Sequence, residues 1–351
     1  HEILPLCIQY LKDNGVPSNA IQVLIARGVH RKLTREEREP FRSGGFRGVR
    51  FEEHDCNNVD KLSALLLTRR GTPVRINRAV KDADVVIILA PISFHYFAGF
   101  GGGRKLILPG VADRQAILAN HRMSLVEGNP VKLNPKCRPG ILEGNPVHED
   151  MLETVEAIEC VFGINFATDE EGGVVFINAG DPAKAHAKAC DAFRVRCRRE
   201  VSEPYDVVVV SAGGDPYDID LLQTHKAIRH TAGAVVTGGT MLLYAECSEG
   251  VGSESLVAAL SKNHRDFLKT AYGEYAVNNQ TAVSILDLTE RFKIGMISAM
   301  NVDVLLAAGI TPCVNAEAFI AEALDKHRSN SLAVVFNGNK ILAELMSGGS
   351  Q

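Results

Sequence analysis

Three residues close together in the sequence are able to do chemistry: His95, Lys105 and His121. Imidazole and amine groups transfer protons, form covalent bonds to cofactors and, in the case of histidine, bind metals. An apolar, β-branched run over residues 85–90 precedes them and predicts a buried strand. Because ligands of open α/β sheets bind beyond the carboxyl ends of the strands, the position of His95 favours a functional role.

The segment between His95 and Lys105 is rich in glycine, with Gly101, Gly102 and Gly103 in succession. Such a loop lets the backbone come close to a ligand, for example a phosphate. It is not a P-loop, because Arg104 precedes the lysine and a leucine follows it, where a P-loop has a hydroxyl residue that holds magnesium. The G-x-G-x-x-G dinucleotide fingerprint is absent from this loop as well.

A further histidine, His30, follows another predicted buried strand, over residues 21–26. The segment 34–37 reads Thr-Arg-Glu-Glu, which is a capping-box pattern and predicts the start of a helix. His30 therefore occupies the same topological place as His95. From the residues alone, a catalytic role and a polar residue in an ordinary loop remain equally open.

The composition is that of an ordinary globular protein with 351 residues, 46% of them hydrophobic, and a net charge of -4. This charge gives no reason to expect nucleic acid or an anionic membrane as a partner. No apolar run is long enough to span a bilayer, and no secretory signal is expected at the start. The eight cysteines form no C-x-x-C pair, so we expect reduced thiols and a cytoplasmic protein.

Strand-like and helix-like segments alternate along the chain, which predicts an α/β fold with two α/β domains, largely parallel sheets and an active site in the cleft between them. We expect a cofactor-binding domain over 1–203, a second domain over 204–330, and a tail over 331–351 that could return to the first domain. Segment 59–67 is expected to be helical, and segment 122–147, with its repeated Gly and Pro, to be a long loop.

The order and spacing of His95, Gly-Gly-Arg-Lys105, Leu-Pro-Gly110 and Ala-Asn-His121 resemble the signature of the nickel-pincer lactate racemase family. This resemblance implies that Lys105 carries the nickel-pincer mononucleotide (pyridinium-3-thioamide-5-thiocarboxylic acid mononucleotide) as a covalent adduct. It implies that His121 is the protein ligand to nickel. The flanking residues that would bind the cofactor are Gly101, Gly102, Gly103 and Arg104.

The resemblance also implies the reaction, which is the racemisation or epimerisation of a 2-hydroxy acid. In that family, hydride leaves the α-carbon for the cofactor, a 2-keto acid forms, and two histidines act as bases. Here those bases would be His30 and His95, and the catalytic pair Gln223 and Lys226 would come from the second domain. The implied partners are the small 2-hydroxy acid and the enzymes that synthesise the cofactor.

Two departures from the family pattern concern the substrate. The family has an Asp-x-Thr-Arg-Pro-like segment whose arginine binds the substrate carboxylate, and we expect this first segment to be missing from the sequence as given. Arg27, beside the first catalytic histidine, is a candidate replacement, or equally a residue that contacts a second carboxylate of a larger acid. Gln280 stands where the lactate racemase has a tryptophan near the substrate. An amide in place of an apolar ring predicts a substrate other than lactate.

Three alternative functions remain. One is an epimerase or dehydrogenase-like hydride-transfer enzyme that uses the same cofactor on a different hydroxy acid, which substrate screening separates from the lactate enzyme. A non-catalytic homologue that only binds the nickel cofactor would need Lys105 and His121 but not His30, His95 or Lys226. A nucleotide-binding α/β protein without nickel fits the fold but not the set of motifs. The sequence does not decide which 2-hydroxy acid is the substrate.

Overall fold

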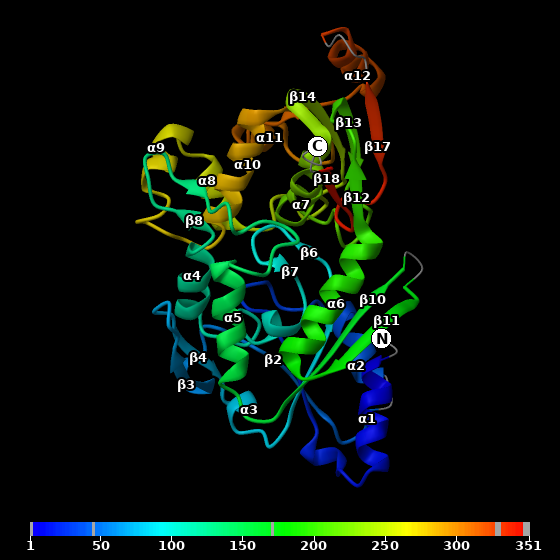
Figure 1. Ribbon diagram of the computed structural model, residues 1–351. Helices are drawn as coiled ribbons and strands as arrows, with labels where there is room; N and C mark the ends of the chain where they lie inside the picture. Colours follow the sequence, from blue (N-terminus) through cyan, green and yellow to red (C-terminus); the bar gives the residue numbers. More distant parts are fainter. Residues whose placement is uncertain (1–2, 44–45, 170–171, 327–330, 347–351) are drawn as a thin grey trace, which may run out of the picture. The chain divides into compact units, whose positions relative to one another are not determined.

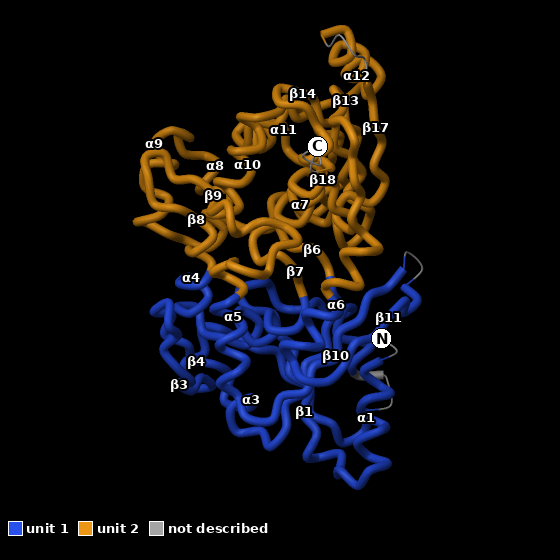
Figure 2. The backbone as a smooth tube through the Cα atoms, in the orientation of Figure 1, with its two compact units in different colours: residues 1–92, 102–120, 149–189 blue, residues 93–101, 121–148, 190–351 orange. Residues whose placement is uncertain are grey.

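The computed structural model describes residues 3–43, 46–169, 172–326 and 331–346. Residues 327–330 and 347–351, which belong to the predicted second domain and tail, lie outside this part of the chain. The chain divides into two compact units, each made of several segments (Figure 1, Figure 2). Unit 1 comprises His1–Ile92, Gly102–Asn120 and Glu149–Ala189; unit 2 comprises Ser93–Gly101, His121–His148 and Cys190–Gln351.

Unit 1 is built on a three-stranded sheet in the order β11-β10-β5. β5 (Val86–Pro91) pairs parallel with β10 (Val161–Thr168), and β11 (Val174–Gly180) pairs antiparallel with β10. The strand predicted over 85–90 is confirmed, although it is buried on one face only: Ile88 is 3% exposed and Ile87 is 37% exposed.

Two smaller sheets and several short helices complete the described part of the first unit. The pairs are β1 (Gln22–Ile25) with β2 (Arg50–Glu53), which is parallel, and β3 (Leu62–Leu67) with β4 (Pro73–Asn77), which is antiparallel. The helices are α1 (Ile3–Asp13), α2 (Arg35–Ser43), α3 (Arg78–Lys81) and the 3-10 helix η3 (Gly103–Leu106), with further short 3-10 turns at η1 (Ser18–Ala20) and η2 (Val59–Lys61). Three helices run from one unit into the other: α4 (Arg114–Arg122), α5 (Pro146–Glu156) and α6 (Pro182–Cys197).

Unit 2 contains a five-stranded parallel sheet in the order β16-β15-β14-β13-β17. Its strands are β13 (Tyr205–Ser211), β14 (Val235–Tyr244), β15 (Lys293–Ile297), β16 (Thr311–Pro312) and β17 (Leu332–Val335). Val207, Val208 and Val210 of β13 are fully buried. A continuous β-branched run suits such a strand, because helices cover both faces of a parallel sheet.

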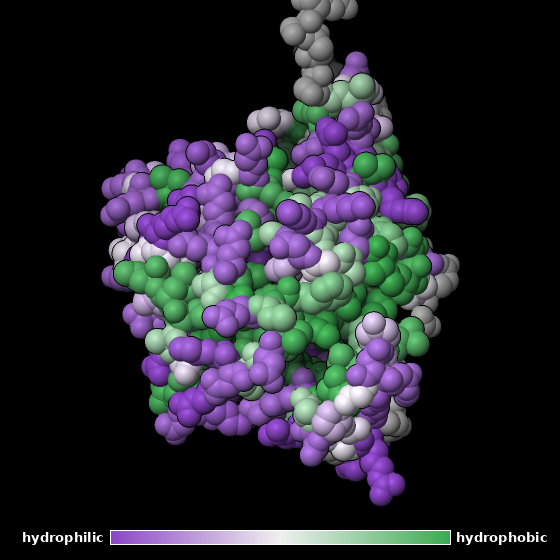
Figure 3. All heavy atoms as spheres, turned by 60° about the horizontal axis from the view of Figure 1, so that its bottom comes forward, coloured by the Kyte–Doolittle hydropathy of each residue, from purple (hydrophilic) through white to green (hydrophobic). Residues whose placement is uncertain are grey.

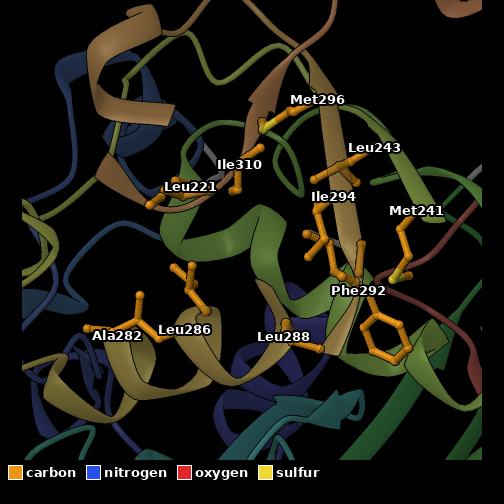
Figure 4. Packing of buried hydrophobic residues seen from close by; sticks show 14 of the residues in the cluster. Leu221, Met241, Leu243, Ala282, Leu286, Leu288, Phe292, Ile294, Met296 and Ile310 are labelled. Carbon is orange, nitrogen blue, oxygen red and sulfur yellow. The ribbon is translucent and has the colours of Figure 1, made fainter. Parts of the chain in front are cut away.

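The core of unit 2 lies where α10 (Asn279–Arg291) packs beside the sheet. Figure 4 shows side chains of α10 pointing toward those of β14 and β15, with Leu286 and Leu288 on the helix and Leu243 and Ile294 on the strands. The other helices of this unit are α7 (Leu221–Thr231), η4 (Ala232–Ala234), α8 (Glu254–Leu260), α9 (His264–Thr270), α11 (Val302–Ala307) and α12 (Ala316–Asp325). Three short strand pairs belong here too: β6 (Phe94–His95) with β7 (Gly99–Phe100), β8 (Leu125–Val126) with β9 (Lys132–Leu133), and β12 (Arg198–Val201) with β18 (Leu342–Leu345).

The compact units differ in extent from the predicted domains. Segments 93–101 and 121–148, expected in the first domain, cluster with unit 2. Aromatic packing explains the first of them, because Phe94 lies 5.1 Å from Phe193 and 5.2 Å from Phe100, ring centroid to centroid, all within unit 2. The described part of the tail also belongs to unit 2, where β17 pairs with β13 and β18 with β12.

One local prediction is wrong. Segment 59–67 is not a helix: it is a single 3-10 turn followed by β3. Its leucines pair with β4 across the turn at 68–72 instead, so cross-strand pairing overrides the local helical preference. Segment 122–147 is mostly loop, as expected, but contains the short pair β8 and β9.

Apolar side chains also reach the surface. Figure 3 shows one face of the molecule on which hydrophobic and hydrophilic residues adjoin each other. Val195 and Phe336, for example, are 84% and 76% exposed. Singly exposed apolar residues are normal in folded proteins, so we assign no interaction surface to them. In the described chain, no helix combines the length and the apolar character needed to cross a membrane.

Candidate functional site

Lys105 lies in η3, directly after a tight turn made by two glycines of unit 1. Gly102 and Gly103 adopt left-handed backbone angles, with φ of +73° and +47°. A Cβ on Gly102 would lie 2.7 Å from the carbonyl oxygen of Pro91, and one on Gly103 would lie 2.5 Å from Cδ2 of His186. The close approach predicted at these glycines is therefore made to protein atoms, and it fixes the path of the backbone into Lys105.

Arg104 holds this turn against α6. Its side chain is only 1% exposed, and Nη1 donates a hydrogen bond to Nε2 of His186 over 2.7 Å. Arginine keeps its charge in proteins, so His186 must accept at Nε2, and its neutral ring then carries the proton on Nδ1. A buried cation thus lies next to Lys105 in the chain, while the side chain of Lys105 itself is half-buried.

Asn165 is a buried amide of unit 1 without a hydrogen-bond partner. It is fully buried on β10, and neither Oδ1 nor Nδ2 has a partner within the described chain. β10 packs against η3, the segment that carries Lys105. Unsatisfied buried amides are rare in folded proteins, so this one indicates a missing polar partner.

His30 lies in the loop after β1, and its side chain is exposed. Arg27 of the same loop donates from Nη1 to the carbonyl oxygen of His30, and its Nη2 lies 3.7 Å from the carboxylate of Asp55. The guanidinium of Arg27, 13% exposed, is thus engaged with its own loop and with an acidic neighbour. It would have to exchange these contacts to bind a substrate carboxylate.

His95 belongs to the β6-β7 hairpin of unit 2 and is 9% exposed. The backbone N–H of Ala98 donates to Nδ1 of His95 over 3.2 Å, so the neutral ring carries its proton on Nε2. The ring lies between aromatic neighbours, 5.2 Å from the Tyr96 ring in stacked geometry and 4.5 Å from the Phe97 ring edge-on, between centroids. The hairpin therefore presents an oriented imidazole in largely apolar surroundings.

Tyr96 and Gln280 belong to a polar network that joins the hairpin to α10. The hydroxyl of Tyr96 lies 2.7 Å from that of Thr281, and the hydroxyl of Tyr275 donates to Oε1 of Gln280 over 2.5 Å. Burial raises the pKa of both tyrosines, so they are neutral donors at ordinary pH. Gln280 is 2% exposed, and its amide oxygen is held in a fixed direction by Tyr275.

Gln223 and Lys226 lie one turn apart on α7, where Nζ of Lys226 donates to Oε1 of Gln223. Asp220 caps this helix by accepting from the backbone N–H of Gln223 over 2.7 Å. Burial lowers the pKa of Lys226 to about 8, while the nearby Asp220 carboxylate opposes that shift. His225 on the same helix is fully buried, and burial lowers its pKa to about 3, so it stays neutral.

His121 ends the sequence Ala-Asn-His in the last turn of α4. Its carbonyl oxygen accepts from the hydroxyl of Ser124 over 2.6 Å, and its ring lies 4.9 Å from that of Phe97, between centroids. Over the described residues, no three His, Cys, Asp or Glu side chains are gathered as a metal site would need.

Within each unit, some of the predicted site residues are linked to one another. In unit 1, Gly110 links the loop of His30 to the segment of Lys105, because its carbonyl accepts from Gly28 over 2.9 Å and its N–H donates to the Lys105 carbonyl over 3.0 Å. In unit 2, Phe97 contacts the rings of both His95 and His121. The Tyr96 ring lies 4.6 Å from that of His225, the residue before Lys226.

The structure also shows polar residues of these networks that the sequence did not single out. They are Tyr96, Thr281 and Tyr275 in unit 2, and Asn165, Asn120 and Asp150 in unit 1. Tyr96 and Asn120 stand inside the motifs that carried the resemblance, which was the available signal. The others have no local signal, because their partners are distant in the sequence.

Comparison with known proteins identifies the family. The fold defines a two-unit α/β protein with a mixed three-stranded sheet in unit 1 and a parallel five-stranded sheet in unit 2. A family model described as the lactate racemase N-terminal domain matches residues 1–132, and one described as the lactate racemase C-terminal domain matches residues 201–342. The chain belongs to the lactate racemase family, which confirms the resemblance seen in the sequence.

Two curated lactate racemases are similar to this chain. The protein from Thermoanaerobacterium thermosaccharolyticum is 34% identical over 252 residues, or 72% of this chain and 57% of the relative. The protein from Lactiplantibacillus plantarum is 30% identical over 276 residues, or 77% of this chain and 63% of the relative. The chain thus matches these relatives over less than two thirds of their length.

Solved structures confirm the α/β fold. The lactate racemase apoprotein from T. thermosaccharolyticum superposes with a TM-score of 0.86 at 27% identity, covering 97% of this chain and 82% of that one. A protein from Thermotoga maritima has a TM-score of 0.72 at 20% identity, covering 96% of this chain and 88% of that one, which shows a shared fold.

Proposed function

We propose that this chain is an enzyme, a racemase or epimerase of a 2-hydroxy acid, and that it uses a nickel-pincer mononucleotide attached to Lys105. The observation that carries the proposal is the setting of Lys105 in a family member. This lysine is fixed by two glycines and a buried arginine. Its segment also contacts β10, the strand that carries the unsatisfied amide of Asn165.

The residues present fit such a cofactor. Asn165 offers a buried donor and acceptor that a polar group of the cofactor would satisfy. The amine of Lys105 is a suitable attachment point, and the imidazole of His121 is a suitable ligand for nickel. Lys105 and His121 would hold the group, and Gly101, Gly102, Gly103 and Arg104 would shape the backbone beside it.

When bound, the cofactor supplies an acceptor for the hydride of the substrate's α-carbon. The protein must then take the hydroxyl proton and give it back, which suits an imidazole near neutral pKa. The two enantiomers point their hydroxyls in different directions, so two bases are needed. We assign these roles to His30 and His95.

The hydrogen bond from Ala98 determines which ring nitrogen of His95 can accept a proton. While Ala98 occupies Nδ1, the neutral ring is a donor at Nε2 and cannot accept a proton there. A base must present a nitrogen lone pair to the hydroxyl. We therefore propose that the bound substrate replaces Ala98 at Nδ1, or that the ring changes tautomer, before proton transfer; at 3.2 Å the Ala98 bond is long enough to be exchanged.

Lys226 and Gln223 would hold the oxygens of the substrate. Lys226 has two N–H groups besides the one given to Gln223, and the amide nitrogen of Gln223 can also donate. A charged Lys226 would stabilise negative charge on the hydroxyl oxygen as its proton leaves. The role of Arg27 as a carboxylate ligand requires it to leave the carbonyl of His30 and the carboxylate of Asp55.

The substrate we propose is larger or more polar than lactate. Gln280 is held by Tyr275, so its amide has a fixed direction. We take this residue as the counterpart of a tryptophan in the lactate racemase. An amide favours substrates with a further polar group. A racemisation assay with lactate, malate and sugar acids tests this, and a clear preference for lactate contradicts it.

The class of enzyme is tested by peptide mass mapping across Lys105 and by nickel quantification, on protein made together with the cofactor-synthesising enzymes. We expect an adduct on Lys105 and about one nickel per chain. An unmodified Lys105 without nickel would leave the plain nucleotide-binding alternative. An adduct without turnover on any 2-hydroxy acid would favour the storage alternative. We propose a cytoplasmic setting, where these partner enzymes would act.

A further inference from the structure

A fully buried carboxylate in unit 1 lies at the centre of a hydrogen-bond cluster. Asp150 of α5 accepts at Oδ1 from the hydroxyl of Thr68 over 2.5 Å, and at Oδ2 from the hydroxyl of Thr72 over 2.9 Å and from Nδ2 of Asn120 over 2.9 Å. Asp150, Asn120 and Thr72 are fully buried, and Thr68 is 3% exposed. Together these residues join the β3-β4 turn, α4 and α5.

The cluster is expensive for a fold to keep. A buried carboxylate costs several kcal/mol unless it is well paired. Asp150 is bound by three neutral donors, and within the described residues it forms no ion pair with Lys, Arg or His. Apolar residues would fill this space at lower cost.

The position of Asn120 in the chain suggests what the cluster does. Asn120 precedes His121, the proposed nickel ligand, in the last turn of α4. Helix ends fray, so a ligand in a last turn is poorly oriented unless a neighbour is fixed. The Asp150 carboxylate fixes the Asn120 side chain, while Ser124 holds the carbonyl oxygen of His121 over 2.6 Å.

We propose that Asp150 is a positioning residue for nickel binding: through Asn120 it fixes the helical turn that orients His121. This inference rests on the proposed function and deepens it. Partners that orient metal ligands usually change metal affinity by about 10- to 100-fold when they are removed. Since Asp150 acts through the backbone of the adjacent residue, we expect the lower end of that range.

The test is nickel retention by the loaded protein, measured as metal per Lys105 adduct after timed incubation with a chelator. The variant Asn120→Asp places two carboxylates together and should speed nickel loss about tenfold. The swap Asn120→Asp/Asp150→Asn restores one donor and one acceptor, since the Thr72 hydroxyl can accept as well as donate, and should recover most of the retention. If Asn120→Asp does not fold, Asn120→Ala replaces it.

A matched control separates positioning from stability. Thr154 of α5 is fully buried and donates to the carbonyl of Asp150 over 2.9 Å, so Thr154→Ala removes a hydrogen bond of the same helix. It should lower the Tm and leave nickel retention unchanged. Nickel retention in Asn120→Asp equal to that of the parent, or loss that tracks the Tm in all variants, overturns the inference. An unmodified Lys105 in the parent protein would instead overturn the proposed function.

Discussion

Lys226 is predicted to destabilise the fold at neutral pH, and its removal should therefore stabilise the apoprotein. Burial lowers its pKa from 10.5 to about 8, which means that the folded protein holds the proton less tightly than the unfolded chain. Wherever the unfolded chain binds more protons, stability rises with pH. The cost is thus fully present below pH 8 and is relieved as the pH rises toward 10.5.

The magnitude follows from the shift. A pKa lowered from 10.5 to about 8 corresponds to at most about 3 kcal/mol, given that the side chain keeps some solvent access. Between pH 7 and pH 9.5, the parent protein should gain about 2 kcal/mol relative to Lys226→Met, in which this group is absent. At pH 7, Lys226→Met should be the more stable protein, because methionine fills similar space without a charge.

The assay is urea unfolding of the parent and of Lys226→Met at both pH values, without any cofactor. Taking the difference between the two proteins cancels the titration of groups that do not interact with Lys226. Lys132→Met serves as the control, since Lys132 is an exposed lysine of the same unit. Identical pH dependence of parent and Lys226→Met would refute the reasoning. A variant less stable than the parent at pH 7 would show that the hydrogen bond to Gln223 outweighs the desolvation of the ammonium group.

Two further predictions concern the proposed bases and the cofactor turn. His95→Ala in the loaded enzyme should lower turnover by about 100-fold or more, with the Lys105 adduct and nickel content unchanged, as followed by a chiral assay; undiminished turnover would remove His95 from the mechanism. Gly103→Ala should cost about 2 kcal/mol or more in urea unfolding, because φ is +47° and the new Cβ would meet His186. At Gly71, φ is +82° and an added Cβ would have nothing within 4 Å. Gly71→Ala should therefore lower the free energy of unfolding only through backbone strain, and equal losses in the two variants would refute the clash with His186.

Local sequence patterns were sufficient to predict strands of the parallel sheet, although these strands pair with segments that are distant in the sequence. The run 207–211 is a central strand because its consecutive valines, 207–210, suit burial on both faces. The same type of argument failed for 59–67, where the apolar residues alternate neither as a clear strand nor as a clear helix. Pairing of β3 with β4 decided the outcome, and that pairing is not visible locally.

The residues of the candidate site can be sorted in the same way, into those with a local sequence signal and those without one. Lys105 and His121 stand in a contiguous motif, so the sequence alone is enough to propose them as site residues. Asp150 gave no signal, because its partners Thr68, Thr72 and Asn120 are polar residues that become a cluster only after three elements pack. Nor does the motif show where the compact units divide: Gly101 clusters with unit 2 and Gly102 with unit 1, so the chain changes unit inside the glycine-rich loop.

The buried polar groups help to separate the possible functions. A protein that stored the cofactor would need Lys105 and His121, and it would gain nothing from a buried ammonium group at Lys226 that lowers stability at neutral pH. A nucleotide-binding protein would not need it either. Lys226→Met therefore carries a joint expectation: higher stability, an unchanged adduct on Lys105, and lost turnover. Higher stability with full turnover would mean that Lys226 lies outside the reaction, and the assignment of α7 to the active site would fall with it.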